Sequence, residues 1–97
     1  MDAQQARKIT KKRLSCFEKE AREDAKSFVE NECADEIQQQ AERGNNCAVV
    51  ETEEGNRHYY MSLAKLSAKL LSGKGFKIRI KKILHDSDAS FQLRINW

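Results

Sequence analysis

The sequence changes its period within residues 41–52, which read Ala-Glu-Arg-Gly-Asn-Asn-Cys-Ala-Val-Val-Glu-Thr. The chain before this stretch has no Gly or Pro and is rich in Ala, Glu, Gln, Lys and Arg, so residues 3–43 predict one long helix. Gly44, followed by two asparagines, is the residue type that commonly ends helices in the left-handed conformation. From Cys47 onward, β-branched residues and short alternating runs replace the helical pattern.

The second half of the chain predicts a compact β-α-β-β unit. Apolar residues at helical spacing make residues 58–72 an amphipathic helix, which Gly73 and Gly75 end. Apolar and polar residues then alternate, as in half-buried strands, and the alternation slips at residues 82–84, which suggests a bulge or a strand end. A polar loop, 85–90, joins the two strands of a hairpin. The expected strands are 47–52, 76–84 and 89–97.

These elements predict an α+β fold in which a long N-terminal helix precedes β-α-β-β, arranged in two layers with a three-stranded sheet. We expect residues 1–43 to be a charged helix available for oligomerisation and residues 44–97 to be the compact domain. The last strand is expected at a sheet edge or beside the first strand. Trp97 continues the apolar alternation of that strand, so we expect it to be buried beside Leu66 or Leu70.

Charge is distributed in blocks along the 97 residues, of which 34% are charged and 39% hydrophobic. Residues 14–43 hold nine acidic and four basic groups, whereas residues 57–97 hold nine basic and two acidic groups. A chain polarised in this way can bind itself or present one face to a polyanion. The low hydrophobic content leads us to expect a surface that is solvated or completed by a partner.

The sequence carries no catalytic or metal-binding motif, so we expect no enzyme activity and no cofactor. Its cysteines, Cys16, Cys33 and Cys47, are odd in number and form no C-x-x-C pair, so we expect free thiols. No apolar run approaches the roughly 20 residues that span a bilayer, and the N-terminus lacks the apolar segment of a signal peptide. We therefore expect a cytoplasmic protein with no membrane partner.

A thin apolar stripe along the long helix is the candidate protein interface. About 40 helical residues at 1.5 Å rise make a rod of roughly 60 Å, which is longer than a small sheet can cover. We therefore expect a homo-oligomer built on this stripe. The candidate interface residues are Leu14, Phe17, Ala21, Phe28 and Ile37.

A basic sheet face is the candidate nucleic-acid site. The polar positions of the two hairpin strands carry cations that could contact phosphates, although lysines on strands also serve as a solvated face that resists aggregation. The face lacks the aromatic residues on which bases stack. Basic residues from Arg7 to Arg13 form either an arm on DNA or a solvated terminus. The candidate residues of the face are Lys77, Arg79, Lys81, Lys82 and Arg94.

Two segments carry a resemblance to known proteins. Residues 70–78 read Leu-Leu-Ser-Gly-Lys-Gly-Phe-Lys-Ile, and residues 93–97 read Leu-Arg-Ile-Asn-Trp. This pattern, over about residues 44–97, resembles small, mostly uncharacterised α-β-α-β-β proteins of bacteriophages and prophages that close on an Ile-x-Trp strand. The resemblance implies the fold and a phage setting, hence the host cytoplasm, and implies no activity.

Three functional hypotheses follow. The first is a non-enzymatic phage-type accessory protein that binds a host or defence protein, for example as an inhibitor such as an anti-CRISPR protein, and that is a homodimer. The second is a nucleic-acid-binding protein that uses the basic face, and the third is a virion assembly component. The acidic segment 18–54 favours the first, because it suits a dedicated DNA-binding surface poorly, while an exposed helix with a thin stripe suits a protein interface.

Overall fold

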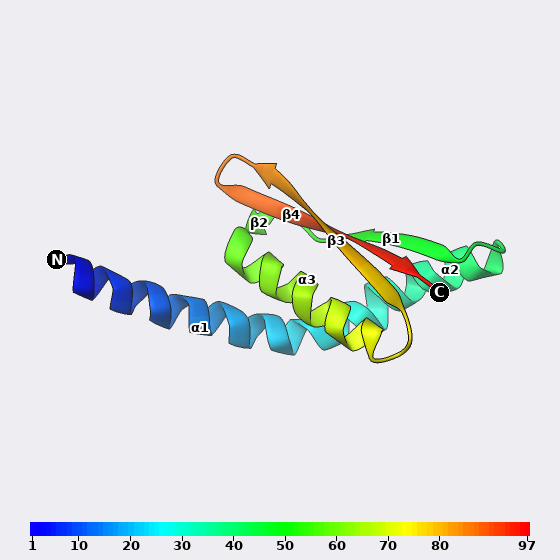
Figure 1. Cartoon of the computed structure of the whole chain (residues 1–97), viewed down its shortest axis with the longest axis horizontal. Coiled ribbons are helices and arrows are strands. Elements are labelled where there is room, and N and C mark those ends of the chain that lie inside the picture. Colours follow the sequence, from blue (N-terminus) through cyan, green and yellow to red (C-terminus); the bar gives the residue numbers. More distant parts are fainter.

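The computed structural model describes all 97 residues, Met1–Trp97, as an elongated α+β protein measuring 57 × 26 × 18 Å. Helices lie on one side of an antiparallel sheet, and the first half of α1 projects beyond the rest of the molecule (Figure 1). The elements are α1 (Ala3–Phe28), a π-helical turn η1 (Val29–Cys33), α2 (Ala34–Glu42), β1 (Cys47–Glu51), β2 (Gly55–Asn56), α3 (Arg57–Ser72), β3 (Lys77–His85) and β4 (Asp88–Asn96).

The predicted N-terminal helix is present and runs without a break through α1, η1 and α2. Asp2 begins it, because its side chain accepts the backbone N–H of Gln5 while the Gln5 side chain accepts the backbone N–H of Asp2. Gly44 ends it at φ +82, a conformation in which Gly carries no Cβ penalty. No helix of the structure is both long and apolar enough to cross a membrane.

The π-helical turn explains how a thin stripe stays on one side of so long a helix. Buried residues recur every fourth position from residue 21 to residue 33, and an α-helix would rotate such a repeat by about 40° at each step. One wider turn at Val29–Cys33 offsets this drift, so both of its end residues remain in the core. The buried repeat consists of Ala21, Ala25, Val29 and Cys33.

β4 is the central strand of the sheet, which has four strands rather than three. β1 and the two-residue β2 pair with β4 on one side, β3 pairs with it on the other, and all pairings are antiparallel. The last strand therefore lies beside the first, which is one of the two positions expected. The side chain of Thr52 bridges the gap between β1 and β2, since its hydroxyl accepts the backbone N–H of Phe91 at 2.9 Å.

The core has two parts because α3 lies between α1 and the sheet. Leu63 faces the small residues Ala21 and Ala25 of α1, which let the two helices approach closely. Ala64 and Leu71 of the same helix pack instead against the apolar face of β4. Figure 1 shows this order, with the sheet on one side and α1 on the other. The core residues of β4 are Ala89, Phe91, Leu93 and Ile95.

The predicted slip at residues 82–84 is wrong. The pairing of β3 with β4 continues in register from Lys77 to His85, and a tight turn at Asp86 and Ser87 replaces the six-residue loop. Asp86 accommodates this turn at φ +52. Leu84 is 63% exposed although it lies on the apolar face, because β3 twists away from α3 toward the hairpin (Figure 1).

The predicted burial of Trp97 is also wrong. Trp97 is 40% exposed, and its ring lies edge-to-face on the ring of Phe76, with 6.1 Å between the ring centroids. The alternation of β4 is correct, but Trp97 lies past the end of the strand, where its backbone N–H donates to the carbonyl of Asn46. The alternation of a strand predicts which face of the sheet a side chain lies on. It does not predict whether another element packs over that face at the end of the strand.

Candidate nucleic-acid interface

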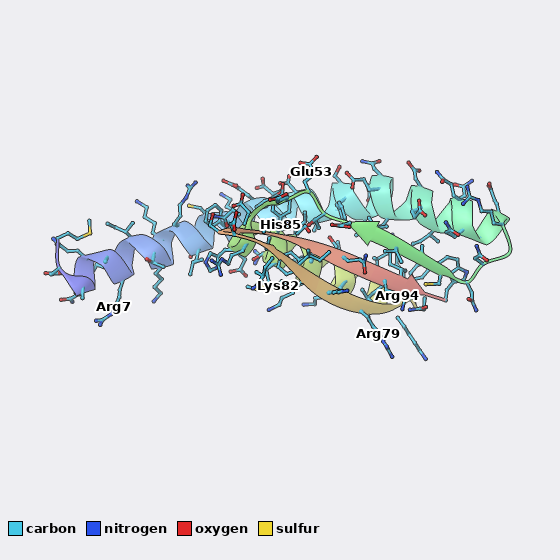
Figure 2. The ribbon with its side chains drawn as sticks, turned by 90° about the horizontal axis from the view of Figure 1, so that it is seen from above. Arg7, Glu53, Arg79, Lys82, His85 and Arg94 are labelled. Atoms are coloured by element: carbon cyan, nitrogen blue, oxygen red, sulfur yellow. The ribbon has the colours of Figure 1, made fainter.

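The outer face of the sheet, opposite the helices, carries a group of four exposed cations that we call the basic face. Lys77, Arg79 and Lys81 come from β3, and Arg94 comes from β4. Alternation along each strand and the register between strands place all four side chains on the same side. Figure 2 looks onto this side and shows Arg79 and Arg94 on neighbouring strands. The four cations thus share one face of the sheet, as the alternation predicts, and their role as a nucleic-acid site stays a prediction.

Two arginines of the basic face lie directly opposite each other. Arg79 is the register partner of Arg94, and like charges at such positions destabilise a sheet. No carboxylate lies within 4 Å of either guanidinium. The close contacts between basic and acidic side chains lie elsewhere, between Arg22 and Glu18 and between the imidazole of His85 and Glu54. Two adjoining hollows open between these cations, and Gln92 and Asn96 also line them, together with Ile78 and Ile80. The four cations of the basic face therefore have no ion-pair partner, although Glu51 of β1 faces the same side of the sheet.

A polar cluster borders the basic face at the hairpin end of the sheet. The hydroxyl of Ser90 donates a hydrogen bond to a carboxylate oxygen of Glu51 at 3.1 Å. Nε2 of His85 lies 3.1 Å from the hydroxyl oxygen of Ser90. Nδ1 of His85 faces a carboxylate oxygen of Glu54 at 3.8 Å. These contacts, which run from Glu54 through His85 and Ser90 to Glu51, join β1, the β1–β2 connection, β3 and β4. Sequence reasoning missed it because its residues come from three separate segments.

This cluster has the residue types of a hydrolytic triad without the access that such a triad needs. Ser90 is only 2% exposed, and its single hydroxyl proton goes to Glu51 rather than to the imidazole. When both ring nitrogens of His85 carry protons, one donates to Ser90 and the other faces Glu54. The arrangement crosslinks the strands and places two carboxylates at one border of the basic face.

Lys82 and the N-terminal cations lie apart from the basic face. The register pairs Lys82 with Phe91, so Lys82 points to the helix side of the sheet at its exposed edge. The basic residues from Arg7 to Arg13 lie on the projecting part of α1, where all of them are exposed. The guanidinium of Arg13 covers the ring of Phe17 at 4.7 Å from its centroid. In Figure 2, Arg7 lies at one end of the molecule and Arg79 toward the other.

The candidate protein-interface residues divide into two groups. Ala21 is buried under α3, and Phe28 and Ile37 pack against the protein's own core. Leu14 and Phe17 lie on the projecting part of α1, where Leu14 is 37% exposed and Phe17 is half-buried. The second half of the helix thus contributes to the compact domain instead of standing apart from it.

An acidic hollow of about 270 Å³ lies where α1 and η1 meet α3. Tyr59 donates a hydrogen bond from its hydroxyl to Asp24, and its ring contacts that of Tyr60 edge-to-face. Burial, followed by this hydrogen bond, raises the pKa of the Tyr59 phenol above its ordinary value. Burial raises the pKa of Tyr60 as well, with a further contribution from Glu53. The hollow fixes α3 on α1 and leaves its carboxylates on the side away from the basic face.

The three cysteines are free, and they differ in environment. Cys33 is buried in the core, and burial, together with the charge of Glu32, raises the pKa of its thiol to about 12. Cys16 is exposed on α1, and Cys47 is half-buried at the start of β1. The structure brings no three metal-ligating side chains together.

Comparisons with protein-family models, with curated proteins and with solved structures found no match to this chain. Arguments about its function therefore rest on the surfaces described above.

Proposed function

We propose that the protein binds nucleic acid through backbone phosphates on the basic face. The observation that carries this proposal is the pair Arg79 and Arg94, two exposed arginines at directly opposed positions of neighbouring strands, neither with a carboxylate within 4 Å. Such a pair costs folding free energy that a bound phosphate would recover, because an anion between two cations replaces repulsion by attraction. Lys77 and Lys81 extend the same surface along β3.

The chemistry of the basic face fits the phosphate backbone better than the bases. Cations two residues apart on one strand are about 7 Å from each other, and they form a row that can follow a charged backbone. No aromatic residue occupies the outer positions of β3 or β4, so base stacking has no platform there. We therefore propose binding that depends little on nucleotide sequence, with the exposed cations from Arg7 to Arg13 as a second point of contact.

Two observations favour this alternative over the protein-binding hypothesis. Ala21, Phe28 and Ile37 are used inside the protein's own fold, which removes much of the apolar stripe on which that hypothesis rested. Of the acidic residues that spoke against a DNA surface, Glu51 and Glu54 lie only at one border of the basic face, and Figure 2 shows Glu53 on the other long side of the molecule. The homo-oligomer, the phage setting and the host partner stay predictions from sequence.

The test is the salt dependence of binding to labelled single- and double-stranded DNA and RNA, measured by fluorescence anisotropy. Four phosphate contacts give a log-log slope of about −3.6 on duplex DNA, so affinity should fall roughly 150-fold between about 50 and 200 mM salt. The triple change of Lys77, Arg79 and Lys81 to Ala should flatten this slope by nearly three units.

A matched variant controls for net charge. Lys19, Arg43 and Lys65 are exposed and lie away from the basic face, so changing these three to Ala removes the same charge and should leave most of the slope in place. Equal losses in the two triple variants would refute a localised site. Absence of binding at the lower salt concentration would refute the proposal itself.

A further inference from the structure

An apolar groove of about 690 Å³ lies between α1 and the C-terminal half of α3, away from the sheet. Ala25 and Val29 form one wall, and Leu66 and Leu70 form the other. Leu70 is 42% exposed here, although it belongs to the helix that fills the core. The groove therefore presents apolar surface that no element of this chain covers.

Cations surround this apolar floor on both sides. Arg22 and Lys26 stand on α1, and Lys69 and Lys74 stand at the end of α3, with Glu30 as the one acidic residue of the lining. Arg22 pairs with Glu18 at 3.4 Å in an exposed contact, whereas none of the three lysines is within 4 Å of a carboxylate. The rim thus has an excess of positive charge that is not satisfied within the protein.

We propose that this groove binds an amphipathic helix of a partner protein, with an apolar stripe flanked by acidic residues. Two neighbouring helices form a trough into which a third helix places side chains at i, i+3/i+4 and i+7. The rim cations come from both walls, and Arg22 and Lys26 are one helical turn apart, so carboxylates on both flanks of such a helix would each meet a cation. Charge complementarity thus selects an acidic partner and rejects a basic one.

This site is separate from the basic face, and the inference does not depend on nucleic-acid binding. The groove is formed by α1 and α3, while the basic face lies on the far side of the sheet from α3. The projecting part of a second copy is a poor occupant, because its cations from Arg7 to Arg13 would meet the cationic rim.

The experiment uses the full chain and two synthetic fluorescent peptides of about 18 residues, long enough for five helical turns. Both carry leucines at helical spacing, flanked by Glu in one and by Lys in the other. The acidic peptide should bind and the basic one should not. Leu70→Glu should weaken binding of the acidic peptide about tenfold, as expected for a residue that anchors a ligand. Lys69→Glu, at an exposed position of the rim, should weaken binding of the acidic peptide and strengthen binding of the basic one.

Two controls separate this site from general attraction. Leu84→Glu introduces the same change at an exposed leucine on β3 and should leave peptide affinity unchanged. The triple Ala variant of Lys77, Arg79 and Lys81 should also retain peptide binding, whereas nucleic-acid binding is lost. The proposal would be overturned if the two peptides bound with equal affinity. It would also be overturned if neither Leu70→Glu nor Lys69→Glu changed the affinity for the acidic peptide. Displacement of the peptide by dodecanoate at lower concentration than any acidic peptide would reassign the groove to a fatty-acid ligand.

Discussion

Replacing Arg94 by Glu should make the protein more stable while it weakens nucleic-acid binding. Arg94 lies directly opposite Arg79, and Lys77 and Lys81 occupy the two diagonal positions of the same face. A glutamate at position 94 would turn one direct and two diagonal repulsions on the β3 side into attractions, while its diagonal pairing with Glu51 on the β1 side would become repulsive. The same change would remove a phosphate contact and place a negative charge in the middle of the basic face.

The size of the stability gain follows from the cross-strand geometry. Direct pairs on one sheet face contribute roughly 0.2–1 kcal/mol, and exposed ion pairs fall in the lower part of this range, so we expect a gain of about 0.5–1 kcal/mol. The unfolding entropy of a chain of this size is about 0.2 kcal/mol/K, so the melting temperature should rise by about 3–5 °C. The salt slope for duplex DNA should flatten by about 0.9 unit or more.

The assay is thermal unfolding of the wild type, Arg94→Gln, Arg94→Glu, Arg79→Glu and the double Glu variant. Arg94→Gln removes repulsion without adding attraction, so its melting temperature should lie between those of the wild type and Arg94→Glu. The double variant restores like charge at the pair and should lose the gain, which closes a double-mutant cycle. At about 1 M salt, where the Debye length is near 3 Å, all differences should shrink. A lower melting temperature for Arg94→Glu at low salt, or a gain that salt does not reduce, would refute the repulsion argument.

Three further predictions test the interior. Ser67 is fully buried with a hydroxyl that has no hydrogen-bond partner, so Ser67→Ala should raise the free energy of unfolding by about 1 kcal/mol in a urea titration, and a loss would imply an unseen partner. Thiol labelling at mild alkaline pH should modify Cys16 first and Cys33 only on unfolding, and equal labelling rates would contradict the burial of Cys33. The raised pKa of Tyr59 means that its neutral form is favoured in the folded state, so its contribution to stability is complete below about pH 10 and is lost as pH rises further. Tyrosinate absorbance and circular dichroism should therefore change at higher pH than free tyrosine ionises, and Tyr59→Phe should reduce this alkaline sensitivity.

The parts of the fold that sequence reasoning predicted are those governed by local chemistry. The long helix lacks any breaker before Gly44, and the positive φ of Gly44 shows why it ends there. Alternation in β3 and β4 placed Arg79 and Arg94 on the side opposite Leu93, as the register confirms. These inferences needed only the period of a segment and the conformational preference of single residues.

The parts that sequence reasoning missed depend on where elements lie relative to one another. Alternation is the same in a central and an edge strand, so the central position of β4 and the exposure of Leu84 were not predictable from period alone. The only sign of the π-helical turn at Val29–Cys33 in the sequence is that small or apolar residues recur at every fourth position. The groove beside Leu70 and the cluster around Ser90 each join separate segments, and no single stretch of sequence contains them.

The position of α3 gives the two proposed sites a relation that can be argued from the layers. One face of α3 packs on the sheet that bears the basic face, and another packs on α1 and lines the groove, so α3 and the sheet separate the two ligands. Both ligands are anionic. At about 0.15 M salt the Debye length is about 8 Å, so charges on opposite sides of α3 and the sheet are screened from each other. The two sites should therefore bind independently at physiological salt, and mutual weakening should emerge only as salt is lowered. Each site selects its ligand by cations that have no ion-pair partner. The acidic residues of α1 lie on the helix side of the sheet, and Glu51 and Glu54 lie only at one border of the basic face, so the opposing charge blocks of the sequence are mostly separated in space rather than neutralised.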